Sequence, residues 1–371
     1  MRFGVCLRRE FACAGIVSFS RLARLCWRWA WRCCPHAPPR RPIPVSQYSA
    51  SVSATYLYRF GNDEPFQPSN AQTAHGQFIP AAAFPTAAYC GHCHAAAYKQ
   101  WQDSLHRNAF REPFYQKNVK LLNDSKGIEY SRHCEGCHNP IALFSGALTP
   151  HSELTRSFDD GLTCSVCHSI VKLQPMRGNG AYVLAAPAVM TDAAGKRIPS
   201  LVPDAQILAH PDRHAHAVMQ PFYRSAEYCG TCHNSNLPVS LTGHKWLKGF
   251  GTYDEWQASS YSQRSPLPFY EKPLTSCQNC HMAAEPAGPG EMAAHAGSIA
   301  SHRWLGGNTA VPFYYGMRDQ LQRTKDFLTQ QRLAIDLFGV ERPGPRNLRR
   351  ARLSLSGSRR AIPRFGLARR S

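Results

Sequence analysis

The sequence predicts a mainly α-helical chain with much irregular loop, organised around groups that it binds rather than around a large sheet. Ten of its 15 cysteines fall in five copies of one short pattern between residues 90 and 281. The 28 prolines and 26 glycines divide the 371 residues into short segments, and no stretch shows sustained strand alternation. Short helices joined by loops are therefore the expected scaffold.

Each copy of the pattern reads C-x-x-C-H. Two cysteines three residues apart lie on one side of a helical turn, where both sulfurs can form thioethers with the vinyl groups of one haem. The next histidine can then be the proximal ligand of the iron. The sequence thus predicts five covalently attached c-type haems at Cys90, Cys93 and His94; Cys134, Cys137 and His138; Cys164, Cys167 and His168; Cys229, Cys232 and His233; and Cys277, Cys280 and His281.

Two other kinds of site use paired cysteines. A zinc site needs four ligands and usually combines two C-x-x-C pairs, but five pairs cannot be shared in that way, and the adjacent histidine would be redundant. A dithiol redox motif would explain one copy rather than five. Haem attachment is therefore the favoured interpretation.

The charge of the chain, +19 from 43 Lys and Arg against 24 Asp and Glu, is concentrated at its two ends. Residues 1–41 hold nine Arg and one Glu, and residues 342–371 hold ten Arg and no acid. The 300 residues between them carry 24 bases and 23 acids. This nearly neutral centre excludes an electrostatic nucleic-acid reader.

Composition divides the chain into four segments. Residues 1–44 form a basic N-terminal segment, which is interpreted as a poor export signal or a misread start because Arg21, Arg24 and Arg28 closely follow its short apolar stretch. Residues 45–85 form a low-signal lead-in, residues 86–340 the predicted pentahaem domain, and residues 341–371 a basic tail expected to be disordered. No run of 18 apolar residues occurs, so no transmembrane span is expected.

Two longer helices are predicted from periodicity. One follows His94, where Tyr98, Trp101 and Leu105 recur on one face. The other carries Met317, Leu321, Leu328 and Ile335, a stripe typical of a helix packed on a core.

A weak internal repeat relates the first and fourth motifs. Tyr89-Cys90-Gly91 matches Tyr228-Cys229-Gly230, and the Y-x-x-W-x-x-S pattern from Tyr98 recurs from Tyr253. The third and fifth motifs both follow a Leu-Thr pair. These matches indicate one ancestral unit used twice. Where the first copy has His106, the second has Tyr261.

These segments resemble a known family. The runs YCGHCHAAAYKQWQDSLHRNAF, CHNPIALFSG, GLTCSVCHSI, TYDEWQASSY, CQNCHM and SHRWLGGNT are similar to multihaem c-type cytochromes related to the tetrahaem electron carrier that serves hydroxylamine oxidoreductase, over roughly residues 86–340. The resemblance implies a multihaem cytochrome c fold with closely paired haems, most having a second histidine ligand. It also implies that His106, and less directly His302, are distal ligands.

The residues leave the other distal ligands open. If the helix from His94 were continuous, its rise of about 18 Å would prevent His106 from serving the same iron as His94, because two axial nitrogens lie only about 4 Å apart. His106 must then serve another haem. After His106 and His302, the first candidate is His214. The further candidates are His216, His133, His151 and His244, with His75, His92, His210 and His295 less favoured.

Two function classes follow. The first is an exported, periplasmic electron-transfer protein that exchanges electrons with redox protein partners, such as donor and acceptor cytochromes or a membrane quinol-linked complex. The second is a haem oxidoreductase with one open iron acting on a small nitrogen or oxygen compound, for which Tyr261 in place of a distal histidine is the motivating feature. All five motifs end in histidine, unlike those of the pentahaem nitrite reductases, so the carrier is favoured.

Overall fold

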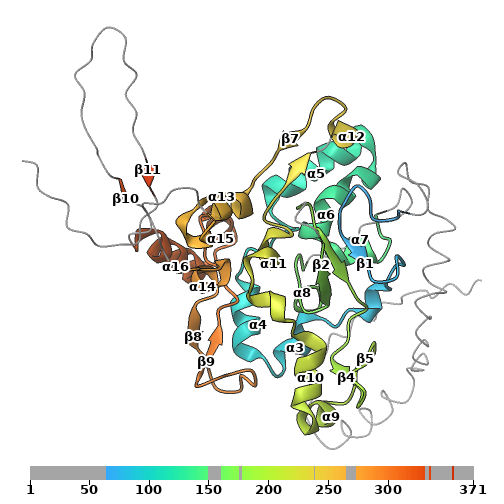
Figure 1. Cartoon of the computed structure of the whole chain (residues 1–371), viewed down its shortest axis with the longest axis vertical. Helices are drawn as coiled ribbons and strands as arrows, with labels where there is room; N and C mark the ends of the chain where they lie inside the picture. The colour runs from blue at the N-terminus through green and yellow to red at the C-terminus, as the bar shows by residue number, and fades with distance from the viewer. Residues whose placement is uncertain are drawn as a thin grey trace, which may run out of the picture. The chain divides into compact units, whose positions relative to one another are not determined.

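The computed structural model describes residues 64–148, 160–174, 178–237, 239–264 and 273–330, with strand residues 334–335 and 353–354. All of them belong to one of the two units into which the chain divides, Pro44–Ser371. Short helices joined by loops dominate this part of the chain, as predicted (Figure 1). The helices are α3 (Ala87–Gly91), α4 (Ala95–Gln102), α5 (Pro113–Lys126), α6 (Arg132–His138), α7 (Pro140–Phe144), α8 (Cys164–Cys167), α9 (Asp204–Ala209), α10 (Pro211–Val218), α11 (Ala226–Gly230), α12 (Val239–Thr242), α13 (Thr252–Ala258), α14 (Cys277–His281), α15 (Ala310–Tyr314) and α16 (Arg318–Thr329).

Strands are short, with two to four residues each. They are β1 (Gln72–Thr73), β2 (Ile170–Leu173), β3 (Tyr182–Leu184), β4 (Met190–Thr191), β5 (Arg197–Ile198), β6 (Asn236–Leu237), β7 (Leu247–Lys248), β8 (Ala284–Pro286), β9 (Ser298–Ala300), β10 (Ala334–Ile335) and β11 (Leu353–Ser354). β1, β3 and β2 form one sheet in that order, with β1 parallel and β2 antiparallel to β3. The other strands pair in twos. Strands this short show no alternation of polar and apolar residues, so no sheet could be predicted from the sequence.

The main hydrophobic core forms around this sheet. Phe78 and Phe144 pack with Phe66, whose ring centroid lies 5.4 Å from that of Phe78 and 5.3 Å from that of Phe144. Tyr182 of β3 and Val166 of α8 belong to the same cluster. The described part of the predicted lead-in therefore contributes core side chains, although its sequence carried no regular pattern.

The predicted helix after His94 ends earlier than expected. α4 stops at Gln102, and Asp103 forms its C-terminal cap. Ser104 then bonds to the local backbone, accepting from the amide of Arg107 at 3.2 Å, which is how serine commonly competes with helix continuation. Leu105 and His106 follow in turns. The continuous helix assumed in placing His106 is therefore wrong.

The second predicted helix is shorter than expected, and its buried face is a different one. α16 begins after Met317 and ends at Thr329, so Ile335 lies outside it, in β10. Its buried residues are Gln320 and Thr324, whereas Leu328 is exposed. The buried face is polar because Gln320 exchanges two hydrogen bonds with Arg303, whose guanidinium lies 3.3 Å from Gln320 Oε1.

The internal repeat has a structural counterpart. A Cβ added to Gly91 would lie 2.5 Å from the ring of Tyr98, and one added to Gly230 would lie 2.6 Å from the ring of Tyr253. In each copy the tyrosine stacks on a tryptophan three residues later. Trp101 Nε1 donates to Leu162 O and Trp256 Nε1 to Thr275 O, both at 2.8 Å, so each copy anchors the chain just before a later C-x-x-C-H motif.

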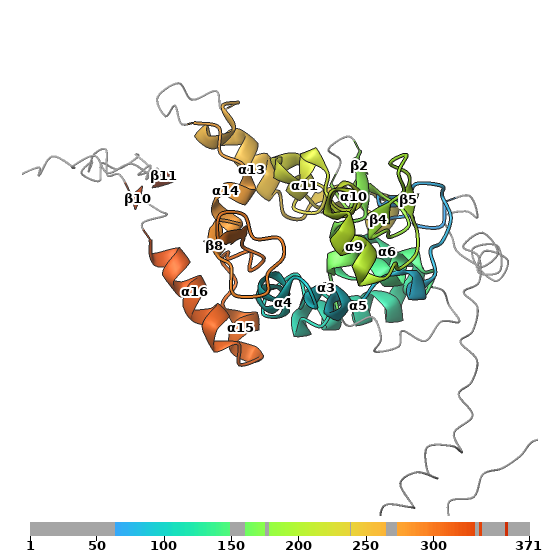
Figure 2. The ribbon, with the colours of Figure 1, turned by 90° about the horizontal axis from the view of Figure 1, so that it is seen from below.

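The β8–β9 hairpin lies beside α4 and α14 (Figures 1 and 2). Its loop returns to the first motif, where Met292 N donates to Cys93 O at 3.0 Å. In the described part of the chain, no helix has both the length and the apolar character needed to cross a membrane.

Candidate haem-binding sites

Each C-x-x-C-H motif folds as one helical turn, as its chemistry requires. The amide of the motif histidine donates to the carbonyl of the first cysteine in the first, third and fourth motifs, at 2.8–3.0 Å. Thr86, Thr163 and Ser276 begin α3, α8 and α14 as N-caps, which satisfies free amides at the start of these short helices. The ten motif cysteines are partly buried.

The motif histidines are oriented through Nδ1. His138 Nδ1 lies 2.8 Å from Ala109 O, His168 Nδ1 2.8 Å from Val218 O, and His281 Nδ1 2.5 Å from Leu305 O. A carbonyl can only accept, so Nδ1 carries the proton and Nε2 keeps a free lone pair. That is the tautomer and orientation of a histidine that binds iron through Nε2.

Two motif histidines face a second imidazole at the spacing of axial ligands. An Fe–N bond of about 2 Å and about 1.1 Å from nitrogen to ring centre, counted on both sides of an iron, give a centroid separation of about 6.2 Å. The centroids of His94 and His214 are 6.1 Å apart, with ring planes 13° apart. His214 lies on α10, and its Nδ1 is 2.6 Å from Val189 O, which leaves Nε2 free.

The second pair joins His106 to the fourth motif. The ring centroids of His106 and His233 are 6.0 Å apart, with planes at 61°. The sequence argument for His106 assumed a continuous helix, which the structure corrects. After the turn that follows α4, the ring of His106 faces the histidine of the fourth motif. Burial lowers the pKa of His106 to about 3, so the imidazole is neutral, as an iron ligand must be.

His302 lies next to these residues. Trp304 is in ring contact with both His106 and His302, at centroid separations of 4.4 and 5.2 Å. Burial, with His168 as the next contribution, lowers the pKa of His302 to about 4. Its Nδ1 lies 2.9 Å from Ala300 O, so its Nε2 is also free.

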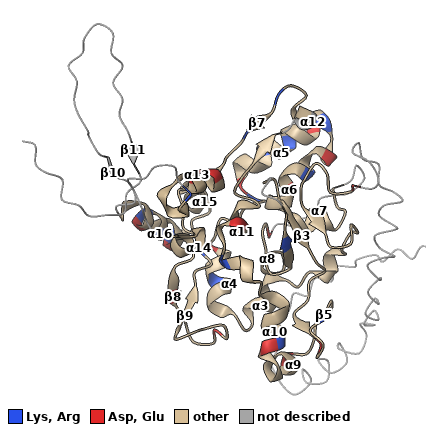
Figure 3. Cartoon of the chain, in the orientation of Figure 1, with Lys and Arg blue, Asp and Glu red and all other residues tan. Residues whose placement is uncertain are grey.

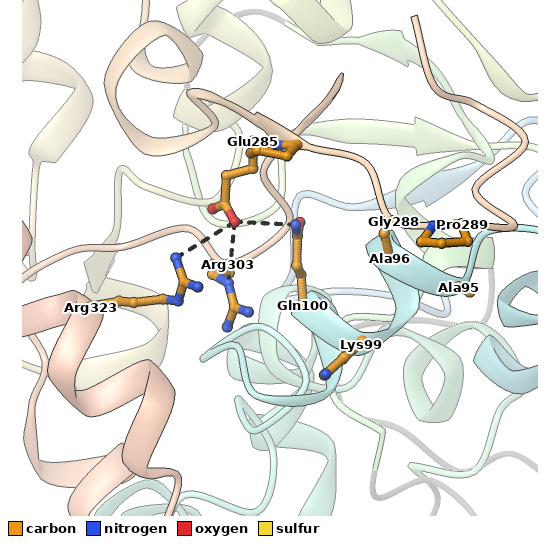
Figure 4. Close-up of a pocket in the computed structure, with 10 residues that line it drawn as sticks. Ala95, Ala96, Lys99, Gln100, Glu285, Gly288, Pro289, Arg303 and Arg323 are labelled. Carbon is orange, nitrogen blue, oxygen red and sulfur yellow. Dashed lines mark hydrogen bonds and ion pairs between the residues drawn. The ribbon is translucent and has the colours of Figure 1, made fainter. Parts of the chain in front are cut away.

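A polar network supports the His302 segment (Figure 4). Gln100 Oε1 accepts from the amide of His302 at 2.8 Å, and Gln100 Nε2 donates to Glu285 Oε2 at 3.3 Å. Arg303 and Arg323 form ion pairs with the same carboxylate. Gln100, Glu285, Arg303 and Arg323 line a cavity of about 480 Å³ together with Lys99, so three cations and one carboxylate surround it.

The remaining candidate ligands differ in exposure. Among those the structure describes, His133 is 6% exposed and lies on α6. His151 lies outside the described residues. The others are exposed in the polypeptide: His75, His92, His210, His216, His244 and His295.

The thiols of different motifs lie against one another. Hydrogen bonding to Cys164 lowers the pKa of Cys90, and contacts with Cys232 and Cys277 raise the pKa values of Cys137 and Cys229. Cys167 and Cys232 also interact electrostatically. The motifs therefore form a connected series, in the order first, third, fourth, with the second and fifth both joined to the fourth.

The second motif has a different environment. The ring of Tyr115 stacks on His138 at a centroid distance of 3.9 Å and 3° between planes. A cavity of about 240 Å³ is lined by His138, Asn108, Glu112 and other side chains that include no second imidazole. Glu135, fully buried within this motif, has its pKa raised to about 8 by burial.

Sequence analysis missed Glu291. Its Oε1 lies 2.9 Å from His94 Nδ1, although the two residues are 197 positions apart. Glu291 lies in a loop rich in glycine and alanine, and nothing in that pattern distinguishes it from a surface carboxylate.

Three comparisons with known proteins bear on these sites. The model of the family described as cytochrome c554 and c-prime matches residues 89–169, which contain the first three motifs. No curated protein matches the chain. A penta-haem cytochrome c552 from Thermochromatium tepidum is structurally similar with a TM-score of 0.39 and 18% identity; the alignment covers 63% of this chain and 60% of that one. The family match confirms the resemblance drawn from the sequence.

Proposed function

We propose that this chain, which is similar to the cytochrome c554 and c-prime family over residues 89–169, relays single electrons through five covalently attached haems, most of them with two histidine ligands. The observation that carries the proposal is the pairing of His94 with His214 and of His106 with His233 at ring separations of 6.1 and 6.0 Å. Haem bound at these sites supplies an iron that changes reversibly between two oxidation states.

The side chains present fit that cofactor. Cysteines stand in pairs on helical turns, and the hydrogen bonds through Nδ1 of His138 and His168 leave Nε2 of each imidazole available to a metal. Cys90 and Cys93 with His94 would hold the first haem, with His214 opposite. Cys229 and Cys232 with His233 would hold the fourth, with His106 opposite. His302, whose Nε2 is also free, is proposed as a further distal ligand.

The arrangement of the motifs supports a relay. Thiols of successive sites lie against one another, so the attachment points form one connected series rather than five isolated positions. His106 comes from the first repeat and faces the fourth motif, which ties the two halves of the series together. Short separations fixed by the polypeptide favour passage of an electron from site to site.

The partners are proposed to be redox proteins: a reduced donor that gives one electron at a time and an oxidised acceptor that takes it. Along the described chain, positions of Lys and Arg are interspersed with positions of Asp and Glu (Figure 3). Each bound haem would add two propionates to the nearly neutral centre of the chain. A basic partner surface would therefore be steered towards it. Because attachment of this kind of haem follows export, we also propose an exported, periplasmic location.

A second candidate function is a haem oxidoreductase acting on a small nitrogen or oxygen compound. It is favoured by the second motif, where the cavity beside His138 has no other imidazole in its lining. Asn108 and Glu112 could there orient a small polar molecule.

One experiment separates the two functions. The oxidised protein, purified with its haems, is mixed with nitrite, and the reduced protein with carbon monoxide. A carrier in which every iron has two protein ligands, both histidine in most cases, gives wholly low-spin electron paramagnetic resonance signals and no spectral change with either ligand. A high-spin signal that shifts with nitrite, together with carbon monoxide binding, would replace the carrier proposal with the oxidoreductase.

A further inference from the structure

Glu291 is bound more tightly than a surface carboxylate. Its side chain is fully buried. Oε1 lies 2.9 Å from His94 Nδ1 and accepts from the amide of Ala293 at 3.1 Å, while Oε2 accepts from the amides of Ala96 and Ala97 at 3.0 and 3.1 Å. Four donors thus converge on one carboxylate, and one of them is the proximal imidazole of the first motif.

The loop that carries Glu291 is fixed against that motif. Glu291 forms a β-bridge with His94, and Met292 N donates to Cys93 O. Gly290 and Gly297 adopt positive φ, which lets the chain turn sharply on both sides of Glu291. The backbone therefore holds the carboxylate at the Nδ1 side of His94.

No other motif histidine with a described Nδ1 partner has a carboxylate there. His138, His168 and His281 donate to the backbone carbonyls of Ala109, Val218 and Leu305. A carbonyl is a neutral acceptor, whereas a carboxylate carries a full negative charge and draws the Nδ1 proton more strongly. The imidazole then donates more electron density through Nε2, and an oxidised iron is stabilised over a reduced one.

We propose that Glu291 is a positioning residue that makes the first haem harder to reduce than the haems held by the carbonyl-bonded histidines. The inference rests on the proposed function, since it requires haem at Cys90 and Cys93. This difference in potential gives electron transfer along the connected sites a direction, because an electron that enters at the first site moves readily to sites that are easier to reduce. The first site is therefore proposed as the end that meets the donor.

The test is a spectroelectrochemical titration of Glu291→Gln, with Glu255→Gln, which alters an exposed carboxylate on α13, as the matched control. Gln keeps the size of the side chain and can still accept from His94, but it removes the charge. One titrating component should move, with its reduced-to-oxidised ratio at a fixed potential rising roughly tenfold, which corresponds to about 59 mV for one electron. The component is assigned as the one whose low-spin signal is lost in His214→Ala.

The outcomes separate this inference from the proposed function. A shift confined to that component supports the role of Glu291, and Glu291→Asp, which keeps the charge, should shift it less. No shift, or an equal shift of every component, overturns the inference while the relay stands. A haem-free peptide around Cys90 and Cys93 in the wild-type protein would instead overturn the proposed function.

If Glu291→Gln does not fold, the wild-type titration remains decisive. The component assigned to the first motif must then have the most negative potential among the sites of His94, His138, His168 and His281. If the potential of the first-motif component is more positive than that of even one of the other three sites, the inference is overturned.

Discussion

Replacing His106 with alanine tests most sharply whether His106, from the first repeat, is the second ligand of the haem at the fourth motif. The centroid separation of His106 and His233 is 6.0 Å, against about 6.2 Å for two imidazoles on one iron. Alanine cannot reach the iron, so one site of the five is expected to lose its sixth ligand, and about one fifth of the low-spin signal should become high-spin.

The assay is electron paramagnetic resonance of the oxidised protein at matched haem concentration, supported by the visible spectrum. Added imidazole should restore the low-spin signal, because the deleted side chain leaves a space of its own size near the iron. His75→Ala is the control, since His75 is exposed and makes no ring contact with a motif histidine. A fully low-spin spectrum of His106→Ala, with five haems still attached, would refute the assignment.

Three further predictions follow from named contacts. His214→Ala should likewise open one iron, that of the first motif, and the double variant with His106→Ala should show twice the high-spin signal by the same spectroscopy. Gly91→Ala should lower the free energy of unfolding by roughly 1–3 kcal/mol in a denaturant titration, because the new Cβ would lie 2.5 Å from the Tyr98 ring. Gly288→Ala, with open space around it, should change the free energy of unfolding by about 0.5 kcal/mol or less, the usual effect of a surface substitution. Glu135→Gln should alter the pH dependence of stability, because burial raises the pKa of this carboxyl from 4.5 to about 8. The folded state favours the protonated form, so this contribution is fully present below pH 4.5 and roughly 4–5 kcal/mol of it is lost as the pH rises from 4.5 to about 8, whereas the Gln variant should lack this loss. Equal profiles for wild type and variant would mean that Glu135 does not titrate in this way.

The two cysteines and the histidine of each haem site could be predicted from the sequence, because they lie within five consecutive residues. A C-x-x-C-H motif needs only one helical turn, and each described motif forms one. His214 was the first candidate after His106 and His302, although the number of histidines could not decide among the candidates, and the structure brings its ring to His94. Its ligand role stays a prediction until the haem-loaded protein is tested.

Features that depend on distant segments were not predictable. The helix from His94 was extended too far because apolar spacing continued to Leu105, while Asp103 and Ser104 favour a turn. The apolar spacing in the α16 region predicted the wrong buried face, because Gln320 is buried by its hydrogen bonds to the buried Arg303. Glu291 reaches His94 only through the β8–β9 hairpin, so its role has no signal in the local sequence.

The number of haems per chain tests the central claim most directly. The measurement combines the pyridine haemochrome assay with the intact mass of the denatured holoprotein, because thioether bonds survive denaturation. The account predicts five haems per polypeptide, with a haem on each of the five C-x-x-C-H peptides. Fewer than five, or haem that is extracted by acidified acetone, would contradict it.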